Sequence, residues 1–232
     1  MKTINLMIFW LRVAFLFLFR SLRSTGILSL MLVTAVAALI FLSALAVGVN
    51  DAMIRNSVSL YSGHISGFNI PYETTKNKLM VPGVAAVLKR FNISGNLVKG
   101  NKTHEVTISE IEPDKEYRVT AIGKKVVEGA YLTETRGQIL IGQTLAKKLG
   151  VNPGDEVRFT PSFSARAITF RVAGIYRTGI DQIDGDIAFC TLGSVPSPST
   201  GWSAAVFLEE GVKPGDIIFA YRGLLPDSAQ FK

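Results

Sequence analysis

A long run without a charged side chain, from Ser24 to Asn50, constrains this chain more than any other feature. Within it, the apolar stretch 26–49 is long enough, at ~1.5 Å per residue, to cross a hydrocarbon core of ~30 Å. We therefore predict a transmembrane helix over residues 24–50. The alternative is a cleaved signal peptide, for which Ala-Leu-Ala at 44–46 offers a cleavage site. The apolar run is, however, longer than the ~7–15-residue core of a signal peptide.

Basic side chains precede this run and an acid follows it. Lys2, Arg12, Arg20 and Arg23 lie before it with no acidic residue among them, and Asp51 lies directly after it. These four residues supply more than half of the net charge of +7. Because basic residues favour the cytoplasmic side, we predict a cytoplasmic N-terminus, with Arg12, Arg20 and Arg23 as topology anchors. The chain is then a single-pass protein of a bacterial inner membrane with a periplasmic C-terminal domain.

A second apolar stretch, Ile4–Arg23, precedes the span, and Arg12 interrupts it near its middle. With Trp10 and Phe15 on the apolar side and arginines able to reach lipid headgroups, residues 1–23 are interpreted as a helix lying at the cytoplasmic interface. A plain hydrophobic extension of the span remains the alternative.

The remaining residues, 51–232, are predicted to form one periplasmic domain. Basic and acidic residues are interleaved there, without a basic stripe that carries stacking aromatics, so nucleic acid is excluded as a partner. The single cysteine, Cys190, has no intrachain partner for a disulfide. A periplasmic domain of this kind would be stabilised by its hydrophobic core.

Hydrophobic periodicity in this domain indicates an α+β fold. Alternation over 62–70 predicts a strand, and residues 81–92 are predicted to be helical because four apolar side chains recur at helical spacing, namely Val84, Val87, Leu88 and Phe91. Strand-rich sequence follows over 95–113 and then 116–122. A helix is expected before Gly150, and a strand over 156–161.

The hexapeptide GVNPGD at 150–155 returns as GVKPGD at 211–216. In the first copy Gly150 ends a helix and Pro153 with Gly154 forms a tight turn before a strand. In the second copy Pro214 suits the first turn of a helix whose buried face includes Tyr221. No other segment recurs at this separation, so we interpret the two copies as turns and not as modules of a repeat protein.

No pattern in the chain predicts catalysis, a cofactor or a metal. The segment GQTLAKK lacks the second glycine and the hydroxyl of a phosphate-binding loop, so any ATPase must be another chain. His64 and His104 stand alone and are expected at the surface or at strand edges. The acids Asp181, Asp184 and Asp186 do not follow a calcium-loop order and are typical of turns. Ser162 and Ser164 lack a neighbouring base that would make either a nucleophile.

Five segments together resemble permease subunits of the lipoprotein-releasing type of ABC transporter, the LolC/LolE group. They are SGHISG (62–67), GAYLTE (129–134), ILIGQTLAKKLGVNPGDEVRFTP (139–161), FRVAGIYRTGIDQIDGDIAFCTL (170–192) and GWSAAVFLEEGV (201–212). That group shares a periplasmic core domain after the first membrane helix with MacB-type efflux proteins and FtsX-like proteins. The resemblance implies a mixed α/β subdomain combined with a strand-rich one.

The resemblance also implies partners. A cytosolic ABC ATPase would hold ATP and Mg²⁺, a second permease subunit would complete a homo- or heterodimer, and a lipoprotein or another amphiphile would be the cargo. A periplasmic carrier is a further possible partner, and membrane lipids surround the span. The first membrane helix of the lipoprotein-releasing members lines the cavity for lipid chains. Its best candidate face here is Val36, Ile40, Ala44 and Val47, although ordinary helix packing would use the same residues.

Three departures from the group stand out. The sequence ends at Lys232, where members continue into three more membrane helices; the segment 161–170 is shorter than the hairpin that grips the carrier; and GSVPSPST (193–200) replaces a helix. Two other functions therefore stay open: a membrane-tethered periplasmic binding or scaffold protein, and an FtsX-like mechanotransmitting protein.

Overall fold

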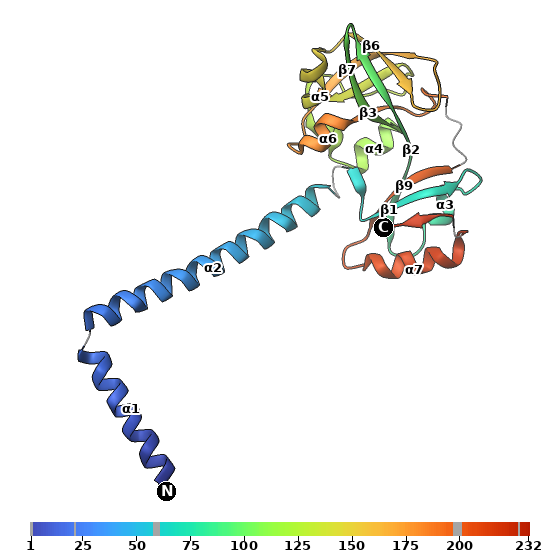
Figure 1. Ribbon diagram of the computed structural model, residues 1–232. Helices are drawn as coiled ribbons and strands as arrows, with labels where there is room; N and C mark the ends of the chain where they lie inside the picture. The colour runs from blue at the N-terminus through green and yellow to red at the C-terminus, as the bar shows by residue number, and fades with distance from the viewer. Residues whose placement is uncertain (1, 21, 58–60, 197–200, 227) are drawn as a thin grey trace. The chain divides into compact units, whose positions relative to one another are not determined.

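The computed structural model describes residues 2–20, 22–57, 61–196, 201–226 and 228–232. The chain divides into two compact units, Met1–Ile54 and Arg55–Lys232. We call the second unit the core domain. Helices and strands both occur in it, so the predicted α+β class is confirmed (Figure 1).

The first unit is helical. Helix α1 spans Lys2–Arg20 and helix α2 spans Leu22–Ser57, with its last three residues in the core domain. Within α2, Arg23–Val49 is long and apolar enough to cross a membrane, and it is the one such segment among the described residues. The second apolar stretch is helical, as expected, whereas its position at the membrane interface stays a prediction.

An antiparallel sheet forms one half of the core domain. Its strand order is β10 (Gln230–Phe231), β1 (Ile65–Pro71), β9 (Gly201–Leu208) and the first half of β2 (Val84–Lys99). Helices α3 (Lys76–Leu79) and α7 (Pro214–Leu224) pack on one face through Leu79, Ile217 and Tyr221. Trp202 of β9 is 1% exposed in this core and donates its indole N–H to the carbonyls of Pro71 and Thr74, each at 3.2 Å.

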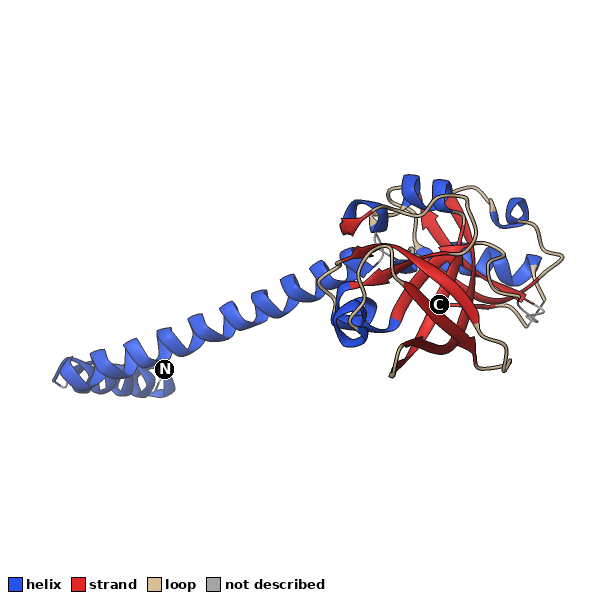
Figure 2. Ribbon diagram, turned by 90° about the horizontal axis from the view of Figure 1, so that it is seen from above, coloured by secondary structure: helices blue, strands red, loops and turns tan. Residues whose placement is uncertain are grey.

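A closed ring of six strands forms the other half. Strands β3, β6 and β7 of this half are labelled near the top of Figure 1, and Figure 2 shows the strands in red. The second half of β2 pairs on one side with β3 and on the other with β6, and the ring continues from β3 through β8, β5 and β7 back to β6. The new strands are β3 (Lys102–Ile111), β5 (Gln138–Gly142), β6 (Glu156–Pro161), β7 (Ile168–Tyr176) and β8 (Ile187–Thr191). Strand β4 (Val126–Gly129) adds to β7 outside the ring.

The interior of this barrel is apolar. Leu97, Ile108, Phe159 and Phe170 are each 0% exposed there, and helix α5 (Gln143–Leu149) adds Leu145 and Leu149 to the same cluster. Three further short helices lie around the strands: α4 (Pro113–Val119), η2 (Ile122–Lys125) and α6 (Asp181–Asp186). Because the ring is closed, each of its six strands has a neighbouring strand on both sides.

The predicted helix over 81–92 is wrong, because these residues enter strand β2. A register shift between Val84 and Ala86 brings Val84 and Val87 into the same core cluster although they are three residues apart. Leu88 packs on the opposite face, with Ala205 and Phe207. A strand covered on both faces shows no simple alternation of polar and apolar residues, so its pattern imitates a helix.

A second correction concerns residues 116–122, where strand-rich sequence was expected. Helix α4 occupies Pro113–Val119 instead, and Thr120 ends it by donating its N–H to the carbonyl of Glu116. Pro113 suits the first helical turn, and the acidic Asp114 and Glu116 favour the positive end of the helix. The expected strands over 62–70, 95–113 and 156–161 are present as β1, β2 with β3, and β6.

The repeated hexapeptide serves two different turns, as predicted. Gly150 ends α5 in the left-handed conformation (φ 70°), and its N–H reaches the carbonyl of Ala146 at 2.8 Å. In the second copy Gly211 has φ 85° in the loop, and Pro214 begins α7. Local backbone chemistry therefore explains both copies.

A substitution at Gly95 tests the closure of the barrel, because β2 pairs with both β3 and β6 at this residue. A Cβ at this position would lie 2.4 Å from the carbonyl oxygen of Thr160 and 2.7 Å from the ring of Phe159. We expect Gly95→Ala to lower the free energy of unfolding by about 1–3 kcal/mol through overpacking. Thermal unfolding of the full chain in detergent, followed by circular dichroism, measures this change.

Gly215→Ala in α7 is the matched control, because no atom lies within 4 Å of its added Cβ. It is expected to be neutral or stabilising by up to ~1 kcal/mol. Equal midpoints for Gly95→Ala and wild type would contradict the tight contact between β2 and β6.

Candidate functional site

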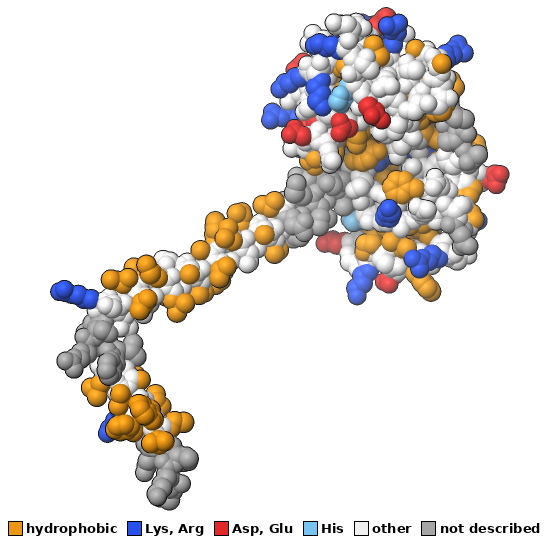
Figure 3. Space-filling view, in the orientation of Figure 1, with side chains coloured by type: hydrophobic (Ala, Val, Ile, Leu, Met, Phe, Trp, Pro, Cys, Tyr) orange, Lys and Arg blue, Asp and Glu red, His pale blue; other side chains and the backbone are white. Residues whose placement is uncertain are grey.

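The candidate lipid-facing residues all lie on α2. The spacing of Val36, Ile40, Ala44 and Val47 places them on one helical face. All four are exposed in the structure, Ile40 and Val47 at 65% each. Apolar residues also cover the other faces of the span (Figure 3), so the structure does not single out this face. Its role in contacting lipid stays a prediction.

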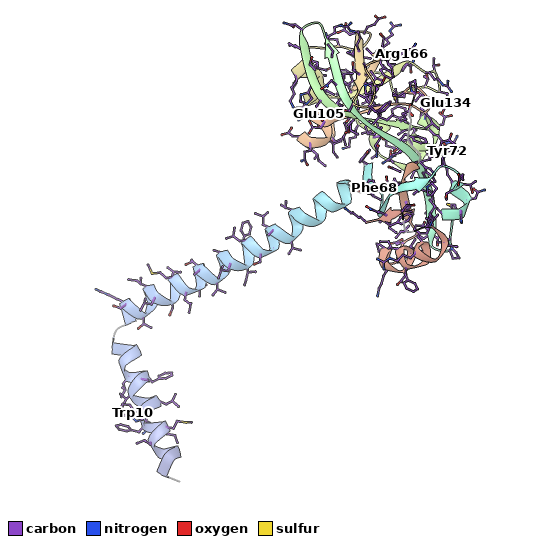
Figure 4. All side chains as sticks on the ribbon, turned by 45° about the vertical axis from the view of Figure 1, so that its right-hand side comes forward. Trp10, Phe68, Tyr72, Glu105, Glu134 and Arg166 are labelled. Carbon is purple, nitrogen blue, oxygen red and sulfur yellow. The ribbon has the colours of Figure 1, made fainter. Side chains whose placement is uncertain are left out.

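The topology anchors lie around α1 and at the start of the span. Arg12 and Arg23 are exposed, whereas the side chain of Arg20 lies outside the described residues. Trp10 is 61% exposed and its ring packs edge-on against Phe9 at 5.8 Å between centroids (Figure 4). An arginine among exposed aromatic side chains has the composition of a helix at a membrane interface. The anchoring role of the three arginines stays a prediction.

The two histidines of the core domain have separate surroundings. Nδ1 of His64 accepts the backbone N–H of Leu208 at 3.2 Å, which fastens the start of β1 to the end of β9. Nε2 of His104 lies 3.4 Å from Oδ1 of Asp186 and 3.4 Å from Nζ of Lys148. Three potential ligands do not gather around either histidine within the described part of the chain.

Of the three acids at 181–186, only Asp184 is buried, at 3% exposure. One carboxylate oxygen accepts the N–H and the hydroxyl of Thr178 at 2.8 and 2.7 Å, and the other accepts the N–H of Gly179 at 3.1 Å. Donors from the chain itself therefore occupy the carboxylate. Its geometry is that of a structural group which fixes the loop before α6.

Asp184→Ala is expected to lower the free energy of unfolding by about 1–3 kcal/mol, because it leaves these donors without their acceptor. The exposed Asp181→Ala is the control and should change stability by less than ~0.5 kcal/mol. Thermal unfolding with and without CaCl₂ measures both effects. A rise in the wild-type midpoint with Ca²⁺ that Asp184→Ala abolishes would instead identify a calcium site.

A small cavity of about 210 Å³ opens where the two sheets meet. Tyr72, labelled in Figure 4, lines it. Lys89 lines it, with Nζ 4.6 Å from the centre of the Tyr72 ring and 5.2 Å from those of Phe91 and Trp202. Burial lowers the pKa of Lys89, and nearby Lys76 adds to this effect. The aromatic rings and the nearby carboxylate of Glu112 stabilise the ammonium charge.

Glu110 lines the same cavity and is 2% exposed. Burial raises the pKa of its carboxyl group, although backbone N–H groups of Val195, Gly193 and Ser194 oppose the rise. The N–H of Val195 donates to Oε1 at 2.7 Å. Glu110 therefore shapes the loop after β8, a role that sequence reasoning missed because nothing local marks this glutamate as buried.

A larger cavity of about 400 Å³ lies beside the loop between β6 and β7. Phe163 and Arg166 of that loop line it, together with Ser194 and Pro196 of the loop after β8. The loop between β6 and β7 is the short hairpin noted in the sequence, and it lines this cavity together with the loop at 194–196. The remainder of the segment GSVPSPST, residues 197–200, lies outside the described residues.

The comparison with family models decides the family. The model described as the MacB-like periplasmic core domain matches residues 25–220, most of the chain. The chain belongs to this family. The MacB-like domain accounts for both halves of the core domain and for the apolar helix that precedes them. A comparison with curated proteins finds no match by sequence.

Two solved structures have the same fold as this MacB-like chain. The periplasmic region of MacB from Actinobacillus actinomycetemcomitans is 16% identical with a TM-score of 0.52, over 76% of this chain and 91% of that one. The extracellular domain of the noncanonic ABC-type transporter YknZ from Gram-positive bacteria is 14% identical with a TM-score of 0.51, over 72% and 98%. At these identities the likeness concerns the fold.

The family match confirms the coarser part of the sequence-based resemblance. A MacB-like periplasmic domain, of the kind carried by permease-type proteins of ABC transporters, is shown, and one apolar helix precedes it. Membership in the lipoprotein-releasing LolC/LolE group is not part of that finding and stays a proposal.

Proposed function

We propose that this chain is a non-ATPase permease subunit of an ABC exporter of the lipoprotein-releasing type. The observation that supports this most strongly is a MacB-like domain joined to an apolar helix long enough to cross a membrane. A cytosolic ATPase would hold ATP and Mg²⁺, a second permease subunit would complete the dimer, and a lipoprotein or another amphiphile would be the cargo. A periplasmic carrier could receive that cargo.

In this mechanism the chain catalyses no reaction: it transmits movement from the ATPase and provides surfaces that contact the cargo. ATP hydrolysis on the partner would tilt α2, and a rigid core domain would convert the tilt into release of the cargo. The closed barrel and the buried sheet core supply that rigidity. The exposed apolar surface of α2 is chemically suited to acyl chains, and Ile40 lies at the middle of its candidate face.

The proposal requires α2 to cross the inner membrane with the core domain in the periplasm. An impermeant maleimide added to intact spheroplasts should label Asn101→Cys in the exposed turn between β2 and β3, and should not label Lys2→Cys until the cells are lysed. The native Cys190 gives little background, because it is 0% exposed and burial raises the pKa of its thiol. Labelling in the reverse order would overturn the orientation.

The function itself is tested by purifying the tagged chain from its native membrane and identifying co-eluting proteins by mass spectrometry. We expect an ABC ATPase and lipoproteins. A photo-reactive residue at Ile40 should cross-link to lipoprotein several-fold more than the same residue at Leu42, which points to the opposite side of α2. Recovery of periplasmic proteins alone would favour the tethered scaffold, and a cell-wall hydrolase with the ATPase would favour the FtsX-like function.

A further inference from the structure

Arg90 lies at the point where β2 passes from one sheet to the other. It is the last residue of β2 paired with β9, opposite Ser203, and Phe91 is the first paired with β3, opposite Glu110. Arg90 is only 3% exposed. A guanidinium so deeply buried must be fully paired, and its partners show which segments it joins.

Helix α4 supplies the first partner. Nε of Arg90 donates to Oε2 of Glu116 at 3.3 Å, and Nη2 donates to Oε1 of the same carboxylate. Glu116 is 1% exposed, so the two charges neutralise each other away from water. The two-point geometry of a guanidinium against a carboxylate fixes orientation as well as distance. The pair therefore locks α4 to the junction between the sheets.

The segment that follows the membrane helix supplies the second partner. Nη1 of Arg90 donates to the backbone carbonyl of Tyr61, and the guanidinium carbon lies 4.5 Å from the centre of the Tyr61 ring. Tyr61 is the first described residue after α2, which ends at Ser57. Arg90 thus holds the chain at Tyr61, four residues after Ser57.

Tyr61 also contacts the barrel half of the domain. Its hydroxyl donates to Oδ1 of Asn92 at 3.2 Å, and its ring lies 5.8 Å from the ring of Phe189 on β8. Both contacts are on the barrel side of Arg90, whereas the pairing of Arg90 with Ser203 belongs to the other sheet. Tyr61, the first described residue after α2, therefore contacts the barrel directly and the other sheet through Arg90.

We propose that Arg90 is the positioning residue that couples movement of α2 to both halves of the core domain, through its contacts to Tyr61 and Glu116. This inference rests on the proposed function and names the contact through which that function operates. Sheet hydrogen bonding of the segment after Tyr61 begins at His64, whose N–H donates to the carbonyl of Val206 in β9 at 2.8 Å. Without Arg90, Tyr61 would keep its contacts with Asn92 and Phe189 on the barrel side but would lose its contact at the junction of the two sheets. The two halves would then receive a weakened and delayed displacement.

The test must avoid leaving one charge buried alone, which would unfold the protein for an unrelated reason. The double variant Arg90→Gln with Glu116→Gln removes both charges and keeps side chains of similar length. Arg90→Lys is the second variant, because one ammonium lacks the planar fork that binds Glu116 and the Tyr61 carbonyl together. The control is the double variant Lys76→Gln with Glu112→Gln. This ion pair is more exposed, with side chains 22% and 23% exposed, and Glu112 directly precedes α4.

The first readout is hydrogen exchange of the full chain in lipid nanodiscs. In both Arg90 variants we expect amides at 62–66 to exchange about tenfold faster than in wild type, with those of β5 inside the barrel unchanged. The control pair should leave 62–66 at the wild-type rate. Unchanged exchange at 62–66 in folded Arg90 variants would show that Arg90 does not fix this segment, and would overturn the inference.

The second readout is made on the complex co-purified with its ATPase. The Arg90 variants should still assemble and hydrolyse ATP, while the lipoprotein released per ATP hydrolysed falls several-fold. Wild-type release per ATP would mean that the contact is structural only. If wild-type chain recovers no ATPase, the proposed function fails by itself, and the exchange experiment still decides whether Arg90 fixes Tyr61.

Discussion

Strand β2 is hydrogen-bonded to β9 over its first half and to both β3 and β6 over its second half. Strand β2 therefore belongs to both sheets, and the other elements of the core domain are arranged around it. The first half of β2 places side chains in the core that α3 and α7 cover. The second half closes the barrel, to whose core α5 adds Leu145 and Leu149. Strand β2 is 16 residues long, and its backbone hydrogen bonds, with one register shift between Val84 and Ala86, join the two halves of the core domain.

Two charged groups at the junction of the two sheets are buried and hydrogen-bonded. Arg90 with Glu116, and Glu110 with the loop at 193–195, place charge where apolar packing alone would suffice for stability. Buried pairs of this kind add little net stability compared with apolar residues, but they define one geometry. The proposed transmission of displacement would need a defined geometry of this kind.

Sequence reasoning located most of the elements in the core domain where a local signal was present. Gly150 and Pro214 mark a helix end and a helix start by backbone chemistry that depends on a few neighbouring residues. The helix predicted from the apolar residues at 84–91 was wrong because both faces of β2 are buried. The elements that cover them, α7 and α4, are distant in the chain. The same limit hid the candidate coupling contact, whose members Tyr61, Arg90 and Glu116 are separated by about thirty residues each.

By itself, the sequence determined the apolar helix, the charge asymmetry around it, the α+β composition of the core domain and the family resemblance. The first three follow from length, charge and local propensity, and the resemblance follows from five matching segments; none of these depends on tertiary contacts. The tertiary structure decided that six strands close into a barrel, that β2 serves two sheets, and that Asp184 caps a loop. Pairing partners and burial arise from contacts between remote segments, and the free energy of such contacts is not encoded in any one stretch of the chain.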